Sequence, residues 1–159
     1  MTVTSYEEML NTTGFLVWKT VGVSMRPLIR EGQDTVIIQK RGEGRCKKYD
    51  VVLFIRPNTE GRGQYVLHRI LKVLPDGTYW IVGDNCLGGE IVREENILGV
   101  LTAVNRRGKK LAVTDFRYRA YVRLWCAPYP IRFFILRYKH YPRAAVRKLL
   151  KILGLKKSR

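Results

Sequence analysis

Residues 65–82 read Tyr-Val-Leu-His-Arg-Ile-Leu-Lys-Val-Leu-Pro-Asp-Gly-Thr-Tyr-Trp-Ile-Val, and this stretch decides the fold class. Two runs rich in β-branched, aromatic and other apolar residues, Tyr65–Leu74 and Thr78–Val82, flank the sequence Pro75-Asp76-Gly77. Runs of that composition are typical of strands, and a Pro-Asp-Gly sequence is typical of a tight turn. The stretch therefore predicts a β-hairpin that carries His68 inside its first strand.

Shorter apolar runs separated by turn residues continue this pattern along the chain. They predict strands at 15–21, 35–38, 51–55 and 97–104, with a loop over Gly83–Arg93 and a basic hairpin tip at Arg106–Lys109. Ser5 with Glu8 three positions later forms a capping box, which predicts a short helix at Tyr6–Leu10 ended by Gly14. Short strands at regular spacing indicate a mainly β, barrel-like domain.

The charge of the chain is strongly asymmetric. Its 159 residues contain 30 Lys or Arg and 13 Asp or Glu, a net charge of +17. Residues 117–159 hold 13 of the basic residues and none of the acidic ones. After Asp115 the apolar pattern becomes helical, and Pro128 and Pro130 are expected to interrupt it. We therefore predict a β domain at 1–115 and a basic helical tail at 116–159.

The end of the tail has the pattern of an amphipathic helix. Val146, Leu149, Leu150 and Leu153 recur at i, i+3, i+4 and i+7, and Lys and Arg residues occupy the other positions. Such a helix is typical of peripheral attachment to an anionic membrane surface. Packing of the apolar stripe on the β domain is the alternative. No base-reading motif appears, which disfavours a nucleic-acid partner.

Cysteine content and the N-terminus bear on the compartment. Cys46, Cys86 and Cys126 are odd in number and show no close pairing, as expected in a reducing compartment. Met1–Asn11 carries Glu7 and Glu8 where a signal peptide needs positive charge, and no run reaches the roughly 18 apolar residues of a membrane span. These features predict a cytoplasmic protein that can attach peripherally to a membrane.

Three short motifs supply the components of a serine nucleophile. They are Gly22-Val23-Ser24-Met25-Arg26-Pro27, the His68-Arg69 pair within the long strand, and Gly83-Asp84-Asn85. A hydroxyl, an imidazole and a carboxylate form the set in which a base activates the nucleophile and an acid orients the base. The backbone N–H of Ser24 is the expected donor to an oxyanion. No metal or cofactor motif accompanies them. Cys86 has no cationic partner adjacent in sequence, which disfavours a thiol nucleophile.

From Val21 to Lys110 these motifs resemble the type I signal peptidase family, which shares its fold with the self-cleaving SOS-repressor peptidases. In that pattern Gly-x-Ser-Met-x-Pro carries the nucleophile, and the base stands just before an Arg on a later strand. His68 holds that place, as in the endoplasmic-reticulum and archaeal type. The resemblance implies a small coiled β-barrel whose site lies on one open face. The absence of a spanning segment departs from the family, whose members usually carry a membrane anchor.

The acidic member of the site has two candidates. The His-type members of the family carry an acid six residues beyond the Asp of Gly-Asp-Asn, and here Glu90 stands where Asp would be expected. Asp84 is alternatively a turn residue that closes a hairpin. We predict a joint acidic site of Asp84 and Glu90, with their division of roles left open.

The sequence thus predicts a serine endopeptidase with Ser24, His68, Asp84 and Glu90 as catalytic residues, acting on a peptide or a leader or precursor segment. Two alternatives remain. One is a regulator related to the self-cleaving repressors, disfavoured by the short N-terminal arm and by the His base. The other is a non-catalytic membrane- or nucleic-acid-binding module on the same fold.

Overall fold

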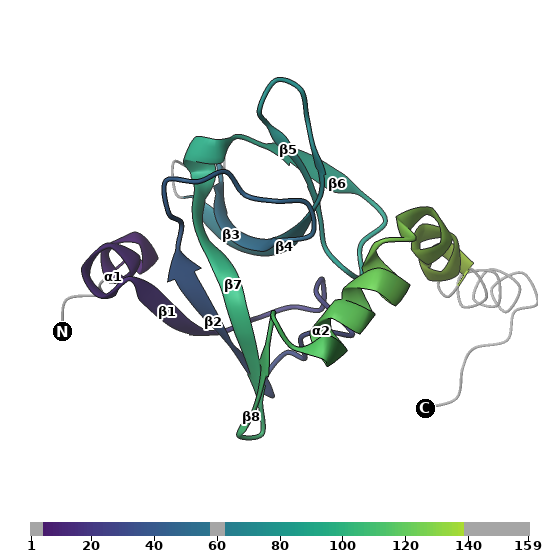
Figure 1. The fold of residues 1–159 in the computed structure, drawn as a ribbon, viewed down its shortest axis with the longest axis horizontal. Coiled ribbons are helices and arrows are strands. Elements are labelled where there is room, and N and C mark those ends of the chain that lie inside the picture. The colour runs from purple at the N-terminus through teal and green to yellow at the C-terminus, as the bar shows by residue number, and fades with distance from the viewer. Residues whose placement is uncertain (1–4, 58–62, 139–159) are drawn as a thin grey trace, which may run out of the picture.

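The protein is built on one curved antiparallel sheet with helices at its two ends (Figure 1). The computed structural model describes residues 5–57 and 63–138. Helix α1 covers Tyr6–Thr13 and begins at Ser5, whose hydroxyl accepts a hydrogen bond from the Glu8 N–H at 3.2 Å. It ends at Gly14, whose φ of 78° lies in the left-handed region that favours glycine. The Ser5 cap is therefore formed as expected, and the helix runs to Thr13, three residues beyond the predicted Leu10.

The sheet has eight strands. Their bounds are β1 Phe15–Lys19, β2 Asp34–Lys40, β3 Val51–Arg56, β4 Gln64–Val73, β5 Tyr79–Val82, β6 Gly89–Val92, β7 Ile97–Arg106 and β8 Lys109–Ala112. A 3-10 turn, η1, spans Glu94–Asn96 before β7. The strands predicted from the apolar runs are confirmed, with ends that shift by one or two residues.

The strand order is β1-β2-β7-β3-β4-β5-β6, and β8 pairs with β7 beside β3. Strands β1 and β6 end this path and are not paired with each other. The expected barrel-like domain is therefore mainly β but not a closed barrel. Register shifts at Ile37/Ile38 and Leu53/Phe54 bend the strands, since an irregular register increases local twist.

Strand β6 lies inside the segment predicted as a loop. Gly89–Val92 pairs antiparallel with β5, so that Glu90 stands opposite Ile81. A four-residue strand that begins with glycine at the edge of a sheet has too little apolar pattern to be recognised in sequence. Its presence places Glu90 at a defined register instead of on a free loop.

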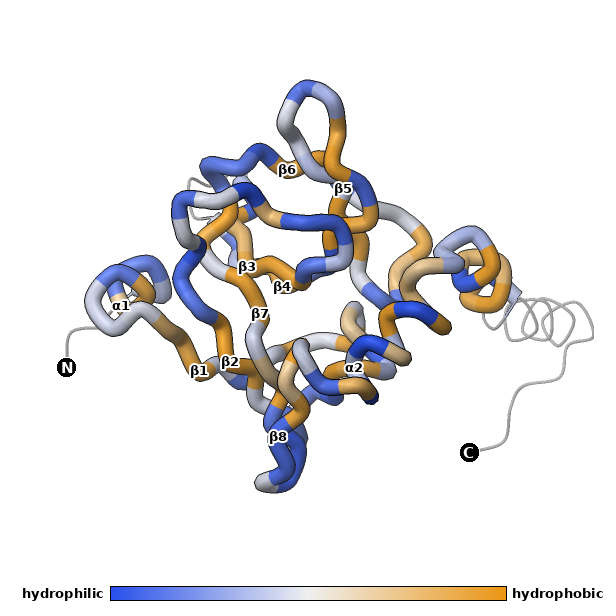
Figure 2. The backbone as a smooth tube through the Cα atoms, in the orientation of Figure 1, coloured by the Kyte–Doolittle hydropathy of each residue, from blue (hydrophilic) through white to orange (hydrophobic). Residues whose placement is uncertain are grey.

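Two groups of buried apolar side chains fill the inside of the curved sheet. One joins α1, β1, β2, β3 and β7, with Leu10, Leu16, Val36, Ile38 and Leu101 among its members. The other joins β3, β4 and β5 and includes Phe54, Ile70, Tyr79 and Ile81. In Figure 2 the labelled stretches of β3 and β4 are hydrophobic, whereas the tip between β7 and β8 is hydrophilic.

The helical segment 116–138 follows β8 and packs on the sheet. Helix α2 covers Phe116–Tyr121, η2 is a π-helix at Val122–Cys126, and residues 129–138 are helical again after a turn at 127–128. Tyr118 belongs to the first apolar core, and Arg132 is fully buried. The change of character predicted at Asp115 is therefore a change from strands to helices, and residues 116–138 are part of the packed fold.

The amphipathic helix predicted around Val146–Leu153 lies outside the described residues. Among the helices of residues 5–57 and 63–138, none is long and apolar enough to cross a bilayer.

Candidate functional site

Ser24 lies in a tight turn between β1 and β2. Gly22 adopts a φ of 96°, which side chains disfavour, and its N–H donates to the Glu31 carboxylate at 2.8 Å. The Arg26 N–H closes the turn on the Val23 carbonyl at 3.2 Å. Ser24 itself is half-buried. The motif thus folds the chain sharply and presents Ser24 at the surface of a cavity.

Ser24 and His68 line the same cavity, of about 390 Å³, although 44 positions separate them in the sequence. His68 lies on β4, where it pairs with Val52 of β3 and is 9% exposed. The remaining wall is mostly apolar and includes Trp18, Met25 and Ile29. The structure therefore places the serine and the histidine, which the sequence had led us to pair, at one cavity.

Gly83 allows the turn after β5 to approach both groups. A Cβ at this position would lie 2.8 Å from the Ser24 carbonyl oxygen, 3.0 Å from His68 Nε2 and 2.7 Å from Cys86 Sγ. The next residues hold the nucleophile turn, because the Asn85 N–H donates to the Ser24 carbonyl at 2.7 Å and its side-chain amide donates to the Val23 carbonyl at 3.2 Å. The Gly-Asp-Asn motif is thus the support on which Ser24 rests.

Glu90 stands beside the other edge of the imidazole. Its Oε1 lies 3.7 Å from His68 Nδ1, longer than a hydrogen bond. Arg56, at the end of β3, fixes this carboxylate with two donors, Nε at 2.7 Å from Oε2 and Nη2 on Oε1. The fork of a guanidinium matches both carboxylate oxygens, which holds the acid in one orientation.

The environment of His68 favours a neutral imidazole. Burial is the largest effect and lowers the pKa of His68 below its ordinary value of 6.5. The Glu90 charge opposes this shift, and Arg56 adds to it. At pH 7 the ring is therefore unprotonated and able to accept a proton.

The alternation of side chains along β4 separates the two candidate acids. Ile70 and Glu90 both pair with Ile81, and His68 lies two residues from Ile70, so His68 and Glu90 share one face of the sheet. Arg69 points to the opposite face. Its Nε and Nη2 each donate to the Asp84 carboxylate at 2.8 Å. The two predicted acids therefore have different partners: Glu90 lies beside His68, and Asp84 is bound by Arg69, although the charges of both acids raise the pKa of His68.

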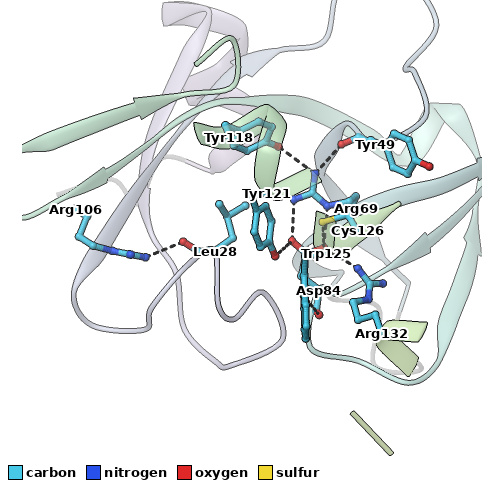
Figure 3. A network of polar contacts seen from close by, with 10 residues as sticks. All are labelled: Leu28, Tyr49, Arg69, Asp84, Arg106, Tyr118, Tyr121, Trp125, Cys126 and Arg132. Atoms are coloured by element: carbon cyan, nitrogen blue, oxygen red, sulfur yellow. Dashed lines mark hydrogen bonds and ion pairs between the residues drawn. The ribbon is translucent and has the colours of Figure 1, made fainter. Parts of the chain in front are cut away.

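Asp84 and Arg69 form the centre of a fully buried polar network (Figure 3). Arg69 Nη1 donates to the Tyr49 carbonyl at 2.8 Å and lies 3.1 Å from the Tyr118 hydroxyl. The Tyr121 hydroxyl donates to Asp84 at 2.9 Å. Cys126 and Arg132 also approach this carboxylate. The network ties the Gly-Asp-Asn turn to the helical segment 116–138.

Two residues of this region were not identified as site residues from sequence. Arg69 could have been noticed, because an arginine inside an apolar strand is stable only with a buried partner. Arg56 gave no signal, since it ends an apolar run before a polar loop, where a basic residue is ordinary. Only the register of the sheet reveals its contact with Glu90.

Cys86 also lines the cavity of Ser24 and His68. Burial raises the pKa of its thiol above the ordinary value of 9.0. A thiol with a raised pKa is a poor nucleophile at neutral pH because little of it is thiolate. Within the described part of the chain, no group of three or more His, Cys, Asp or Glu could hold a metal ion.

Comparison of the chain with protein-family models, with curated proteins and with solved structures gave no match.

Proposed function

We propose that this protein is a serine endopeptidase in which Ser24 is the nucleophile, His68 the general base and Glu90 the residue that orients the base. One observation carries the proposal: Ser24 and His68 line one cavity, and the far edge of the imidazole faces a carboxylate. A hydroxyl, an imidazole and a carboxylate in this spatial order are the arrangement that activates a serine. The His68–Glu90 contact is long, at 3.7 Å, as catalytic contacts often are before substrate binds.

The reaction follows from these placements. Ser24 Oγ attacks the carbonyl carbon of a peptide bond while its proton passes to His68 Nε2. The resulting imidazolium returns the proton to the leaving amine as the C–N bond breaks, which leaves an ester on Ser24. Water then attacks the ester carbon while His68 takes its proton, and the C–O bond to Ser24 breaks as His68 returns that proton to Ser24 Oγ, which releases the new carboxyl product. The negative Glu90 stabilises the imidazolium at both stages.

Stabilisation of the oxyanion is assigned to the backbone of the nucleophile turn. The Ser24 N–H makes no hydrogen bond within residues 5–57 and 63–138 and adjoins the attacking oxygen. Asn85 and Gly83 fix the turn from the opposite side, so this donor is positioned before substrate arrives. A pre-oriented N–H of this kind is worth about 3 kcal/mol of transition-state stabilisation.

An extended peptide suits the surroundings of the cavity. Among residues 5–57 and 63–138, strand β1 pairs on one side alone, with β2, and residues 64–67 of β4 pair only with β3. Both segments adjoin the cavity, so a substrate strand would find backbone donors and acceptors there. The apolar wall with Trp18, Met25 and Ile29 favours an uncharged residue next to the cleaved bond.

Reaction with a serine-directed fluorophosphonate, followed by peptide mass mapping, tests the proposal. We expect one adduct on Ser24 in the natural chain, none on the Ser24→Ala chain and a labelling rate lower by several orders of magnitude for His68→Ala. Cys86→Ser is the matched control and should keep the natural rate. A folded natural chain that gave no adduct on Ser24 would refute the proposal.

A contact with anionic membranes is proposed as a second property. The helical segment 116–138 exposes large apolar side chains beside basic ones; the exposed apolar residues include Phe116, Leu124, Ile131 and Phe134. Basic residues near an anionic leaflet contribute about 1 kcal/mol each, and inserted apolar side chains add to this.

A further inference from the structure

A second cavity, of about 750 Å³, lies between the sheet and the helical segment 116–138. It shares no lining residue with the cavity of Ser24 and His68. We call it the helix–sheet groove and define it by its apolar floor, which consists of Val51, Val100, Leu101, Val113 and Val122.

The rim of the helix–sheet groove is basic. Lys40, Lys48, Arg119 and Arg123 line it and are exposed. Among the residues that the structure describes, no carboxylate forms an ion pair with any of these four. A fifth cation on the rim, Arg41, is paired with Glu94 at 2.8 Å.

Acidic residues in the lining of the groove do not offset this positive charge. Asp50 is the single acidic residue in the lining, and its carboxylate accepts a hydrogen bond from the Lys47 N–H at 2.8 Å. An apolar floor under four cations that have no carboxylate partner among the described residues is complementary to a molecule with an apolar body and an anionic end. The volume lies within the range of small-molecule sites, about 300–1,000 Å³.

The backbone of the floor argues against a peptide as the occupant. Val100 on β7 pairs with Gln39 of β2 on one side and with Val52 of β3 on the other. Val51 on β3 pairs with Arg69 of β4. These strands offer little free edge to which an extended peptide could add. Apolar contact and charge are what the groove offers, and an acyl chain with an anionic head uses both.

We propose that the helix–sheet groove binds a single-chain fatty carboxylate, with the chain on the apolar floor and the carboxylate between Arg119 and Arg123. Arg119 in α2 and Arg123 in η2 both line the groove, which places them on the same side of the segment. This site is separate from the proposed peptidase centre and does not depend on it.

Isothermal titration calorimetry of the full chain with decanoate and dodecanoate, each below its micelle concentration, tests the proposal. We expect saturable binding of one carboxylate per chain. The affinity should rise roughly tenfold from decanoate to dodecanoate, because each buried methylene contributes about 0.8 kcal/mol. Dodecyltrimethylammonium, which has the same chain and a cationic head, should not bind the groove.

Paired charge variants locate the site. Arg119→Gln with Arg123→Gln should weaken dodecanoate binding about tenfold or more. Arg117→Gln with Arg137→Gln removes the same charge from exposed positions outside the groove and should change binding less than twofold. Equal losses in the two pairs would overturn the proposal in favour of general attraction to a basic chain. It would also be overturned if dodecanoate did not bind, or if an acidic peptide bound with the Arg119 and Arg123 dependence instead.

Discussion

His68 and Arg69 are adjacent in the sequence and have opposite chemical tasks. His68 faces the cavity with Ser24, where burial keeps it neutral, and Arg69 is a buried cation that faces Asp84. Burial lowers the pKa of Arg69, and the Asp84 carboxylate raises it. The carboxylate, through its charge and its hydrogen bonds together, has the larger effect, so the pKa of Arg69 lies well above the ordinary value. One strand can thus supply a neutral base to one face and a permanent charge to the other.

The pKa of His68 sets the expected pH dependence of labelling. The base must be unprotonated to act, and its pKa lies below 6.5 because burial disfavours the imidazolium. The fluorophosphonate rate should therefore be constant near neutrality and decline only as the pH falls through that lowered pKa. A histidine with an unperturbed pKa would show this decline at a higher pH. Labelling rates measured from timed, stopped reactions across pH 4–8 give the pH at which the rate falls. A fall centred well above pH 6.5 would contradict the assignment of His68 as the base.

Arg56 is predicted to position the base through Glu90. Arg56→Gln removes both donors to the carboxylate and a positive charge that disfavours the imidazolium. We expect a labelling rate lower by up to about a hundredfold. The fall of the rate at acid pH should move to higher pH, because Arg56 no longer offsets the charge of Glu90 beside His68. Arg56→Lys keeps the positive charge but loses the paired guanidinium donors. It should therefore lower the labelling rate and leave the fall of the rate at acid pH near its original pH. If Arg56→Gln changed neither the labelling rate nor the pH at which the rate falls, the positioning role of Arg56 would be wrong.

At the scale of elements, the turn between β5 and β6 acts as a support for the nucleophile turn between β1 and β2. Asn85 holds two successive carbonyls of that turn, and Gly83 permits the close approach. The motif at Gly83–Asn85 could be recognised as important from sequence, but its task could not. The pairing of distant segments depends on strand order, and the sequence does not show that β5 and β6 bring this turn against Ser24.

The support predicts a difference between two glycines of the same loop. At Gly83 a Cβ would contact Cys86 Sγ at 2.7 Å and the Ser24 carbonyl at 2.8 Å, whereas at Gly88 it would meet nothing within 4 Å. Gly83→Ala should therefore destabilise the fold by about 1–3 kcal/mol and slow labelling of Ser24 strongly. Gly88→Ala, in which φ does not require glycine, should stay within about 0.5 kcal/mol and label normally. Urea unfolding and the labelling rate provide the two measurements, and equal behaviour of the two variants would refute the role of Gly83.

For the molecule as a whole, the sheet and the helical segment 116–138 form one folded unit. The strand pattern predicted a mainly β domain, and the loss of alternation after Asp115 located the start of the helices. Their docking was not predictable, since it rests on the contacts of Arg69 with Tyr118 and of Asp84 with Tyr121, which join residues 49 and 37 positions apart. The open sheet was not predictable either, because the apolar patterns of β1 and β6 do not determine whether these two strands pair.

The buried network predicts where the chain can be shortened. Ending it after Asp115 removes the hydroxyls of Tyr118 and Tyr121 from two fully buried charged groups, whereas ending it after Tyr138 keeps all of these contacts. Hydrogen bonds to charged groups contribute about 1.5–3 kcal/mol each. The shorter chain should therefore lose at least about 3 kcal/mol of unfolding free energy in urea, and the longer one should match the full chain. Equal midpoints for all three would mean that the network does not hold the sheet.

The chain ending at Tyr138 also tests membrane attachment, because it keeps the contacts of the buried network. The removed residues 139–159 contain eight Lys or Arg and no acid, while Phe116, Leu124 and Ile131 remain exposed on the retained part. We expect the full chain to sediment with vesicles rich in anionic lipid and to be released in large part by high salt, because screening weakens exposed charge attraction. The shortened chain should bind more weakly and with less dependence on salt, since fewer basic residues contribute. Vesicles of neutral lipid are the control. Equal sedimentation of both chains at every salt concentration would show that residues 139–159 do not contribute, and no sedimentation of either would refute the attachment.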